Sequence, residues 1–264
     1  MVQLKLNVRN LQMQLWKECK DLIVALIFPS VCIHCHQPIS TNEAIADTIY
    51  QHAMADFVCK TCIQDFQPGS YNKCIRCGEV ITDSSHKKCC HACETFKKSF
   101  DKVRFVGLYQ GTYKQLIHLY KFKNKRQLAK PFAYLLGQRL ERCKDELFPI
   151  DMIAPVPLHI SRLRMRGFNQ ALLMLWQWRD YLSKIEPTLL IRTRPTPSQI
   201  HLSRAQRLNN LTSAFQLNSN ISVAGKRILL IDDVYTTGAT IHECSQVLIN
   251  SGAECVNALT LARA

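Results

Sequence analysis

The 264-residue sequence predicts an α/β protein with a mostly parallel sheet flanked by helices and a small cysteine-rich domain before it. Two observations support this prediction. Strand-like and helix-like segments alternate from about residue 100 onward, which is typical of βα units. Residues 30–97 hold four Cys-x-x-Cys pairs, a spacing typical of zinc knuckles. We expect an N-terminal helix over 1–29, a double zinc ribbon over 30–97 and the α/β domain over 98–264.

Hydrophobic periodicity places the elements of the α/β domain in order. The expected strands cover residues 103–109, 151–156, 189–192, 228–231 and 255–261, and the expected helices cover residues 112–120, 127–147, 169–182 and 240–250. Gly252 suits the position after the last of these helices. Leucines near helical spacing also predict a helix over residues 3–28, which Pro29 ends.

Basic residues are concentrated in two segments of a chain whose formal net charge is +14. Residues 97–130 hold ten Lys/Arg against one acid, and residues 155–210 hold nine against two. Such segments suit a polyanionic partner, and an exposed basic surface is the alternative. The longest apolar run, residues 22–28, is far shorter than the ~20 residues that span a bilayer. With no secretory signal visible, we expect a cytoplasmic protein, with peripheral attachment at the inner membrane as the alternative.

Eight of the thirteen cysteines form the four pairs Cys32/Cys35, Cys59/Cys62, Cys74/Cys77 and Cys90/Cys93. Zn²⁺ prefers four thiolates in a tetrahedron, so four pairs predict two structural zinc sites. Pairing the first with the second and the third with the fourth closes the shorter loops and is preferred. Pairing the first with the third is the alternative. A site of four thiolates leaves no open coordination position, so catalytic zinc is not expected.

Other residues near the pairs could replace some of these ligands. Cys89 adjoins Cys90 and could take its place, although only Cys90 has the x-x spacing to Cys93. Four histidines are alternative ligands that we expect at the surface: His34, His36, His86 and His91. The cysteines in expected helices or strands should lie in the core, namely Cys19, Cys143, Cys244 and Cys255.

The stretch ILLIDDVYTTGAT, residues 228–240, runs from an apolar strand into two adjacent carboxylates and a small polar loop. In open parallel sheets, ligands bind beyond the carboxyl ends of the strands, where Asp232 and Asp233 lie. The backbone N–H groups of the loop and of the next helix suit a phosphate, and Gly238 allows a close approach. Paired acids suit vicinal hydroxyls, so the stretch predicts a sugar-phosphate site. A phosphoacceptor, a Walker B acid or a simple strand end would not need the Thr-Thr-Gly-x-Thr that follows.

This stretch resembles the phosphoribosyl pyrophosphate (PRPP) motif of type I phosphoribosyltransferases. The resemblance implies that Asp232 and Asp233 contact the ribose hydroxyls and that the following loop binds the 5-phosphate. The loop residues are Thr236, Thr237, Gly238, Ala239 and Thr240. The resemblance also implies a Mg²⁺ ion that bridges the diphosphate and the ribose, with oxygen ligands.

Three further stretches resemble the ComF family of competence proteins. They are LYKFKNKRQLAK (119–130), APVPLHISRLRMRGFNQA (154–171) and RPTPSQIHLSRAQRLNNLTSAF (194–215). Members of that family begin with a double zinc ribbon, so the resemblance spans almost the whole chain. It implies a role in natural transformation, in which the protein binds incoming single-stranded DNA in the cytoplasm. A competence helicase or an inner-membrane DNA channel would be its partner, and the oligomeric state is open.

The resemblance also gives roles to the basic segments. Arg162, Arg164 and Arg166 follow a strand at the place where the diphosphate lies in phosphoribosyltransferases, and arginine suits bidentate phosphate contacts. An exposed basic turn is the alternative. Residues 194–215 resemble the mobile loop of these enzymes. Arg204 and Arg207 in it are candidates for stabilising the leaving diphosphate, and also for contacting DNA phosphates.

A basic segment interleaved with aromatic residues suits single-stranded DNA, because bases stack while cations follow the backbone. The cations are Lys121, Lys123, Lys125 and Arg126. The aromatics Tyr120 and Phe122 could instead belong to the core. Two other functions stay open beside DNA handling: an active phosphoribosyltransferase of unspecified acceptor, and a PRPP-sensing regulator. The fold alone does not decide among them.

Overall fold

The computed structural model describes residues 30–39, 48–64, 73–81, 88–96, 98–147, 149–195 and 213–264. The chain divides into two compact units, residues 1–64 and residues 65–264. The described part of the first unit contains α2 (Ile49–Met54) and α3 (Lys60–Ile63). Thr48 and Gln51 form a capping box that begins α2. The helix expected over 1–29 lies outside the described residues, and the three-part division at residues 29 and 97 stays a prediction.

The second unit is built on a four-stranded sheet whose strands are all parallel. Its strand order is β1 (Val103–Leu108), β6 (Cys255–Arg263), β5 (Arg227–Tyr235) and β2 (Met152–Pro155). This arrangement confirms the predicted α/β class. Residues 228–231 of β5 are all buried, as expected for a central strand covered on both faces. The strand continues through the two acids to Tyr235, so Asp232 and Asp233 belong to the last part of the strand and do not follow it.

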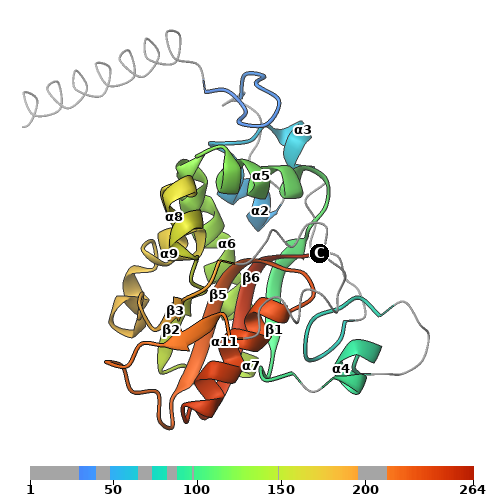
Figure 1. Cartoon of the computed structure of the whole chain (residues 1–264). Helices are drawn as coiled ribbons and strands as arrows, with labels where there is room; N and C mark the ends of the chain where they lie inside the picture. Colours follow the sequence, from blue (N-terminus) through green and yellow to red (C-terminus); the bar gives the residue numbers. More distant parts are fainter. Residues whose placement is uncertain are drawn as a thin grey trace, which may run out of the picture. The chain divides into compact units, whose positions relative to one another are not determined.

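Helices cover both faces of this sheet. The helix α6 (Ala129–Arg142) contacts β1 and β6, and α9 (Gln170–Leu175) contacts β5 and β2. On the other face, α11 (Ala239–Asn250) contacts β6 (Figure 1). The remaining elements are α4 (His91–Thr95), α5 (Gly111–Phe122), α7 (Lys144–Leu147), α8 (Ile160–Arg166), and the 3-10 turns η1 (Arg126–Leu128) and η2 (Arg179–Lys184). Among the described residues, none of the helices has the length and hydropathy that a membrane span requires.

Two helices expected from periodicity are shorter in the structure. The helix expected over 127–147 is divided into η1, α6 and α7, with a break at Cys143, whose backbone leaves the helical region at ψ 17°. The helix expected over 169–182 ends at Leu175. Beyond it, the indole of Trp178 donates a hydrogen bond to the Ala133 carbonyl at 2.9 Å. This tertiary contact orients Trp178 toward α6 and is not visible in a local pattern.

The strand expected at 189–192 does not join the parallel sheet. It forms β3 (Leu190–Arg192), which pairs antiparallel with β4 (Phe215–Leu217) in a separate two-stranded sheet. Neither β4 nor α8 is among the expected elements, because segments of three and seven residues are too short to show a clear period.

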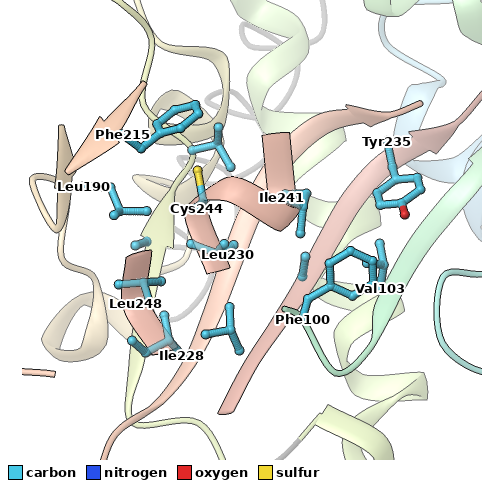
Figure 2. Packing of buried hydrophobic residues seen from close by; sticks show 14 of the residues in the cluster. Phe100, Val103, Leu190, Phe215, Ile228, Leu230, Tyr235, Ile241, Cys244 and Leu248 are labelled. Carbon is cyan, nitrogen blue, oxygen red and sulfur yellow. The ribbon is translucent and has the colours of Figure 1, made fainter. Parts of the chain in front are cut away.

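The main hydrophobic core joins the parallel sheet, α11 and the second cysteine region. Its buried members include Cys74, Cys77 and Cys93 beside Phe100 and Tyr235. Figure 2 shows Tyr235, Phe100 and Val103 together at one end of this cluster, with Leu190, Phe215 and Cys244 at the other. Cys143 and Cys244 are buried as predicted and Cys255 is half-buried, whereas Cys19 lies outside the described residues. The second cysteine region is therefore part of the core of residues 65–264.

Candidate functional site

The eight paired cysteines form two clusters of four. In each cluster, all the sulfur atoms lie within 4.8 Å of one another. The Sγ–Sγ distances are 3.7 Å between Cys35 and Cys59, and 3.6 Å between Cys77 and Cys90. A tetrahedral zinc ion with ~2.3 Å bonds needs sulfur atoms roughly 3.8 Å apart, whereas a disulfide needs about 2.05 Å. The two clusters therefore fit two structural zinc ions.

The clusters follow the sequential pairing. Cys32, Cys35, Cys59 and Cys62 form the first, and Cys74, Cys77, Cys90 and Cys93 form the second. In the second, Cys90 and not Cys89 completes the set. Of the alternative histidine ligands, His34, His36 and His91 lie outside both clusters, and His86 is outside the described residues.

Both clusters are built from the same two local structures. The first Cys-x-x-Cys pair of each lies in a tight hairpin, closed by a bridge between Val31 and Pro38 or between Lys73 and Val80. The second pair of each begins a short helix, with Cys59 and Cys90 as the N-cap residues. Each cluster therefore repeats the same arrangement, in which one Cys-x-x-Cys pair lies in a hairpin and the other begins a helix.

The acid pair lies at the carboxyl end of β5. Successive strand residues point to opposite faces, and Asp233 forms an ion pair with Lys121 of α5 at 2.7 Å. The backbone N–H of Asp233 donates to the Asp232 carboxylate at 2.8 Å. Burial and the adjacent Asp233 raise the pKa of Asp232 to about 7. The site therefore holds two carboxylates in different environments, one neutralised by a lysine and one that takes up a proton near neutral pH.

The polar loop after the acids leads directly into α11. Gly238 is the N-cap of α11, with φ +77°, and Thr237 accepts a hydrogen bond from the Ala239 N–H at 3.4 Å. The first-turn N–H groups of α11 face the same end of the sheet as the acids. Such N–H groups, together with the helix dipole, suit a phosphate. The loop residues Thr236 to Thr240 therefore lead directly into the N-terminus of α11, and their contact with a phosphate stays a prediction.

Gly238 is required for two reasons, and its replacement should be costly. Its φ is left-handed, and a Cβ at this position would lie 2.1 Å from the hydroxyl of Tyr235. We expect Gly238→Ala to lower the free energy of unfolding by about 2–4 kcal/mol, from backbone strain plus the overlap. Urea denaturation measures this loss. Gly225→Ala is the matched control, because Gly225 has φ +66° and no atom within 4 Å of the added carbon. Equal losses in the two variants would show that the Tyr235 contact is unimportant.

Arg192 lies near Asp232 and also near two arginines of α8, Arg162 and Arg166. Arg162 and Arg166 are four residues apart on α8 and half-buried, whereas Arg164 between them is exposed. Burial and the positive charge of Arg162 lower the pKa of Arg192 to about 10, and Asp232 partly offsets this effect. Burial and Arg166 lower the pKa of Arg162 in the same way. The three guanidinium groups therefore lie close enough together to disfavour one another's charge.

Some residues of this site were not found by sequence reasoning. The sequence places Arg192 only at the end of an expected strand, whereas the alternation in β3 places it on the buried side with Leu190. Lys121 is expected from the sequence to contact DNA; in the structure its ammonium pairs with Asp233, and its side chain is 16% exposed. Arg204 and Arg207 lie outside the described residues.

The aromatic residues of the 119–130 segment have different environments. Tyr120 is fully buried, donates to the Gln170 carbonyl at 2.9 Å and packs edge-on against Phe132. Phe122 is 46% exposed. Lys123 and Arg126 are exposed and Lys125 is half-buried. Tyr120 therefore belongs to the core, and Phe122 is available at the surface.

The parallel sheet, the acid pair at its carboxyl edge and the glycine loop define a protein with a phosphoribosyltransferase domain. Residues 193–264 match the family model described as "Phosphoribosyl transferase domain". Competence protein F of Haemophilus influenzae is 30% identical over 237 residues, which cover 88% of this chain and 96% of that protein. The chain belongs to the ComF family of competence proteins.

Two further relatives extend this comparison. DNA utilization protein YhgH of Escherichia coli is 29% identical over 241 residues, which cover 90% of this chain and 99% of that protein. Competence protein ComFC of Streptococcus pneumoniae is 29% identical over 238 residues, which cover 88% of this chain and 99% of that protein. The similarity therefore includes the cysteine-rich region as well as the phosphoribosyltransferase domain.

Proposed function

We propose that this ComF-family protein binds incoming single-stranded DNA in the cytoplasm during natural transformation and retains a PRPP site. The observation that carries the proposal is the ion pair between Lys121 and Asp233. It connects the acid pair of the phosphosugar site to the basic segment that begins at Lys121. The exposed residues that directly follow Lys121 in the chain therefore begin beside the acid pair.

Different residues of the site suit the ribose, the 5-phosphate and the diphosphate of PRPP. The carboxylates of Asp232 and Asp233 would accept hydrogen bonds from the ribose hydroxyls, and the loop from Thr236 to Thr240 would hold the 5-phosphate. Arg162, Arg166 and Arg192 would contact the diphosphate, because guanidinium groups match phosphate oxygens. Mg²⁺ would supply a hard cation that neutralises the diphosphate beside the acid pair.

The surface next to this site has features that suit single-stranded DNA. The ring of Phe122 lies 4.8 Å from the ring of His118 and 4.8 Å from the Arg166 guanidinium. The guanidinium of Arg126 lies 5.0 Å from the ring of Phe168. We call the exposed or half-exposed residues Phe122, Lys123, Lys125 and Arg126 the basic-aromatic track. Its aromatic ring can stack a base, and its cations can follow phosphates.

Substitutions in the basic-aromatic track test DNA binding. Phe122→Ala should weaken binding of a labelled single-stranded oligonucleotide by about 5- to 150-fold, since stacking contributes ~1–3 kcal/mol per base. Lys123→Ala should lower the slope of log affinity against log salt by about 0.7. Fluorescence anisotropy across a salt series, with single- and double-stranded probes, measures both effects.

Two exposed residues outside the track serve as controls. Trp176→Ala removes another aromatic residue that is 50% exposed, and Lys144→Ala removes a lysine of α7 whose side chain is 60% exposed. Both variants should bind DNA as the wild type does. If wild-type protein binds no single-stranded DNA at low salt, the proposal is wrong. If Trp176→Ala weakens binding as much as Phe122→Ala, the strand binds elsewhere.

A second candidate function is phosphoribosyl transfer to an acceptor. The cluster of Arg162, Arg166 and Arg192 favours it, because cations at the diphosphate position stabilise a leaving group. To test it, the protein would be incubated with PRPP, Mg²⁺ and a panel of nucleobases, and the release of diphosphate would be measured. Release that is lost in the variant with Asp232→Ala and Asp233→Ala supports transfer. PRPP binding without turnover supports a PRPP-sensing regulator. A competence helicase or inner-membrane channel would be the protein partner.

A further inference from the structure

Arg263 ends β6 directly beside the loop that follows the acid pair. It is opposite Tyr235 in the strand register, and only 7% of its surface is exposed. Its guanidinium donates hydrogen bonds to the carbonyl of Thr236 and to that of Ala264, and lies 4.7 Å from the ring of Tyr235. Arg263 therefore contacts the first residue of the phosphate loop through the backbone.

The other side of the same guanidinium contacts the second cysteine cluster. Its Nη2 forms an ion pair with Glu79. The backbone of Glu79 is fixed in turn, because its carbonyl accepts a hydrogen bond from the Cys74 N–H at 2.8 Å. A continuous set of contacts thus runs from a cysteine of the cluster through Glu79 and Arg263 to Thr236.

A second route joins the same two regions through aromatic packing. Tyr235 packs edge-on against Phe100, with 6.1 Å between the ring centroids. Arg76, between Cys74 and Cys77, donates two hydrogen bonds to the Phe100 carbonyl at 3.2 and 3.0 Å. The cysteine knuckle therefore supports Tyr235 through Phe100, and the hydroxyl of Tyr235 lies next to Gly238.

A cavity of about 380 Å³ lies at this junction. Its lining includes Cys77 and Glu79 from the knuckle, and Thr236, Thr237 and Arg263 from the other side. Along this stretch the loop and the knuckle are separated by open space instead of packed side chains. The guanidinium of Arg263 connects the two sides of this cavity, through Thr236 on one side and Glu79 on the other.

We propose that Arg263 is a positioning residue that holds the phosphate loop against the second cysteine knuckle through Glu79. The proposal rests on the proposed PRPP function, in which this loop holds the 5-phosphate. An arginine suits the role because its planar fork can donate to a backbone carbonyl and a carboxylate at once, which a lysine cannot do in the same geometry. Loss of either contact should leave the loop free to move into the cavity.

The test compares Glu79→Gln and Arg263→Lys with Arg227→Lys. Arg227 is a matched control because it also bonds a carboxylate with two nitrogens, at 3.0 and 3.1 Å to Asp151, but begins β5 at the other end of the strand. Glu79 is half-exposed, so its variant should fold. Hydrogen exchange over residues 235–240 measures the loop directly, and zinc content and calorimetric PRPP affinity are measured on the same samples.

We expect Glu79→Gln and Arg263→Lys to speed exchange in the loop by about tenfold, with both zinc ions retained, while Arg227→Lys leaves it unchanged. PRPP affinity should fall by about three- to tenfold in the first two variants only. Unchanged loop exchange in both Glu79→Gln and Arg263→Lys would overturn the inference. If wild-type protein binds no PRPP, the proposed function is wrong, and the exchange comparison still decides whether Arg263 holds the loop.

Discussion

Cys77→Ser should remove one of two bound zinc ions and lower the free energy of unfolding of residues 65–264 by more than about 3 kcal/mol. Structural zinc contributes on the order of 10 kcal/mol of binding free energy that is coupled to folding. Cys77 is 3% exposed and belongs to the same hydrophobic cluster as Phe100 and Tyr235. Loss of this metal should therefore disturb the sheet core and the loop from Thr236 to Thr240 together. Elemental analysis of zinc and urea denaturation measure the two effects.

The same substitution in the first cluster should have a different result. Cys35→Ser should also remove one zinc ion, but Cys35 lies in the unit of residues 1–64, so the unfolding of residues 65–264 should be unchanged. Cys143→Ser is the control for the loss of a buried thiol, since Cys143 is 2% exposed and outside both clusters. It should retain two zinc ions. Two zinc ions in the Cys77 variant, or equal destabilisation by the Cys35 and Cys77 variants, would contradict this prediction.

The two adjacent acids should have opposite effects on stability when each is replaced by asparagine. Asp232 has a pKa of about 7 in the folded protein against an ordinary value of 3.8, because of burial and the charge of Asp233. The folded state then binds more protons than the unfolded state between these values, so ionisation of Asp232 lowers stability as pH rises from about 4 to 7. Asp232→Asn removes this loss. We expect the variant to be more stable than wild type at pH 8 by up to about 4 kcal/mol, with little difference near pH 4.

Asp233→Asn should instead destabilise the protein at neutral pH. It leaves the ammonium of Lys121, 16% exposed, without its 2.7 Å carboxylate partner. A mostly buried charge that loses its partner costs about 1–3 kcal/mol. In the proposed complex each acid would accept a charge-assisted hydrogen bond from a ribose hydroxyl, so both variants should weaken PRPP binding by about 10- to 100-fold.

Urea denaturation at pH 4 and pH 8 and calorimetric titration with PRPP and Mg²⁺ measure these effects. A double variant that combines Lys121→Met with Asp233→Asn serves as a control. It removes the lysine that Asp233→Asn leaves unpaired, so it should recover part of the lost stability. If both asparagine variants change stability in the same direction at pH 8, the acids do not occupy the two environments that we describe. Retained PRPP affinity in both variants would contradict their role in the phosphosugar site.

The sequence predicted the α/β class because the signals that define it are local. The run of apolar residues at 228–231 identified a central strand, and the Gly252 position marked the end of the last helix. It failed where tertiary contacts override local periodicity. The hydrogen bond of Trp178 to α6 is one such contact, and the pairing of β3 with β4 instead of the main sheet is another.

The sequence by itself determined the chemistry of each local motif. Two thiolates at x-x spacing form one knuckle, and an acid pair before Thr-Thr-Gly-x-Thr forms one strand end and one loop, because the groups that act together are separated by a few bonds. Only the tertiary structure decided which distant groups meet these motifs. Lys121 reaches Asp233, Arg192 lies near Asp232, and Arg263 joins Thr236 to Glu79. Such partners depend on how strands and helices pack, and packing brings together residues whose separation in the chain has no period to reveal it.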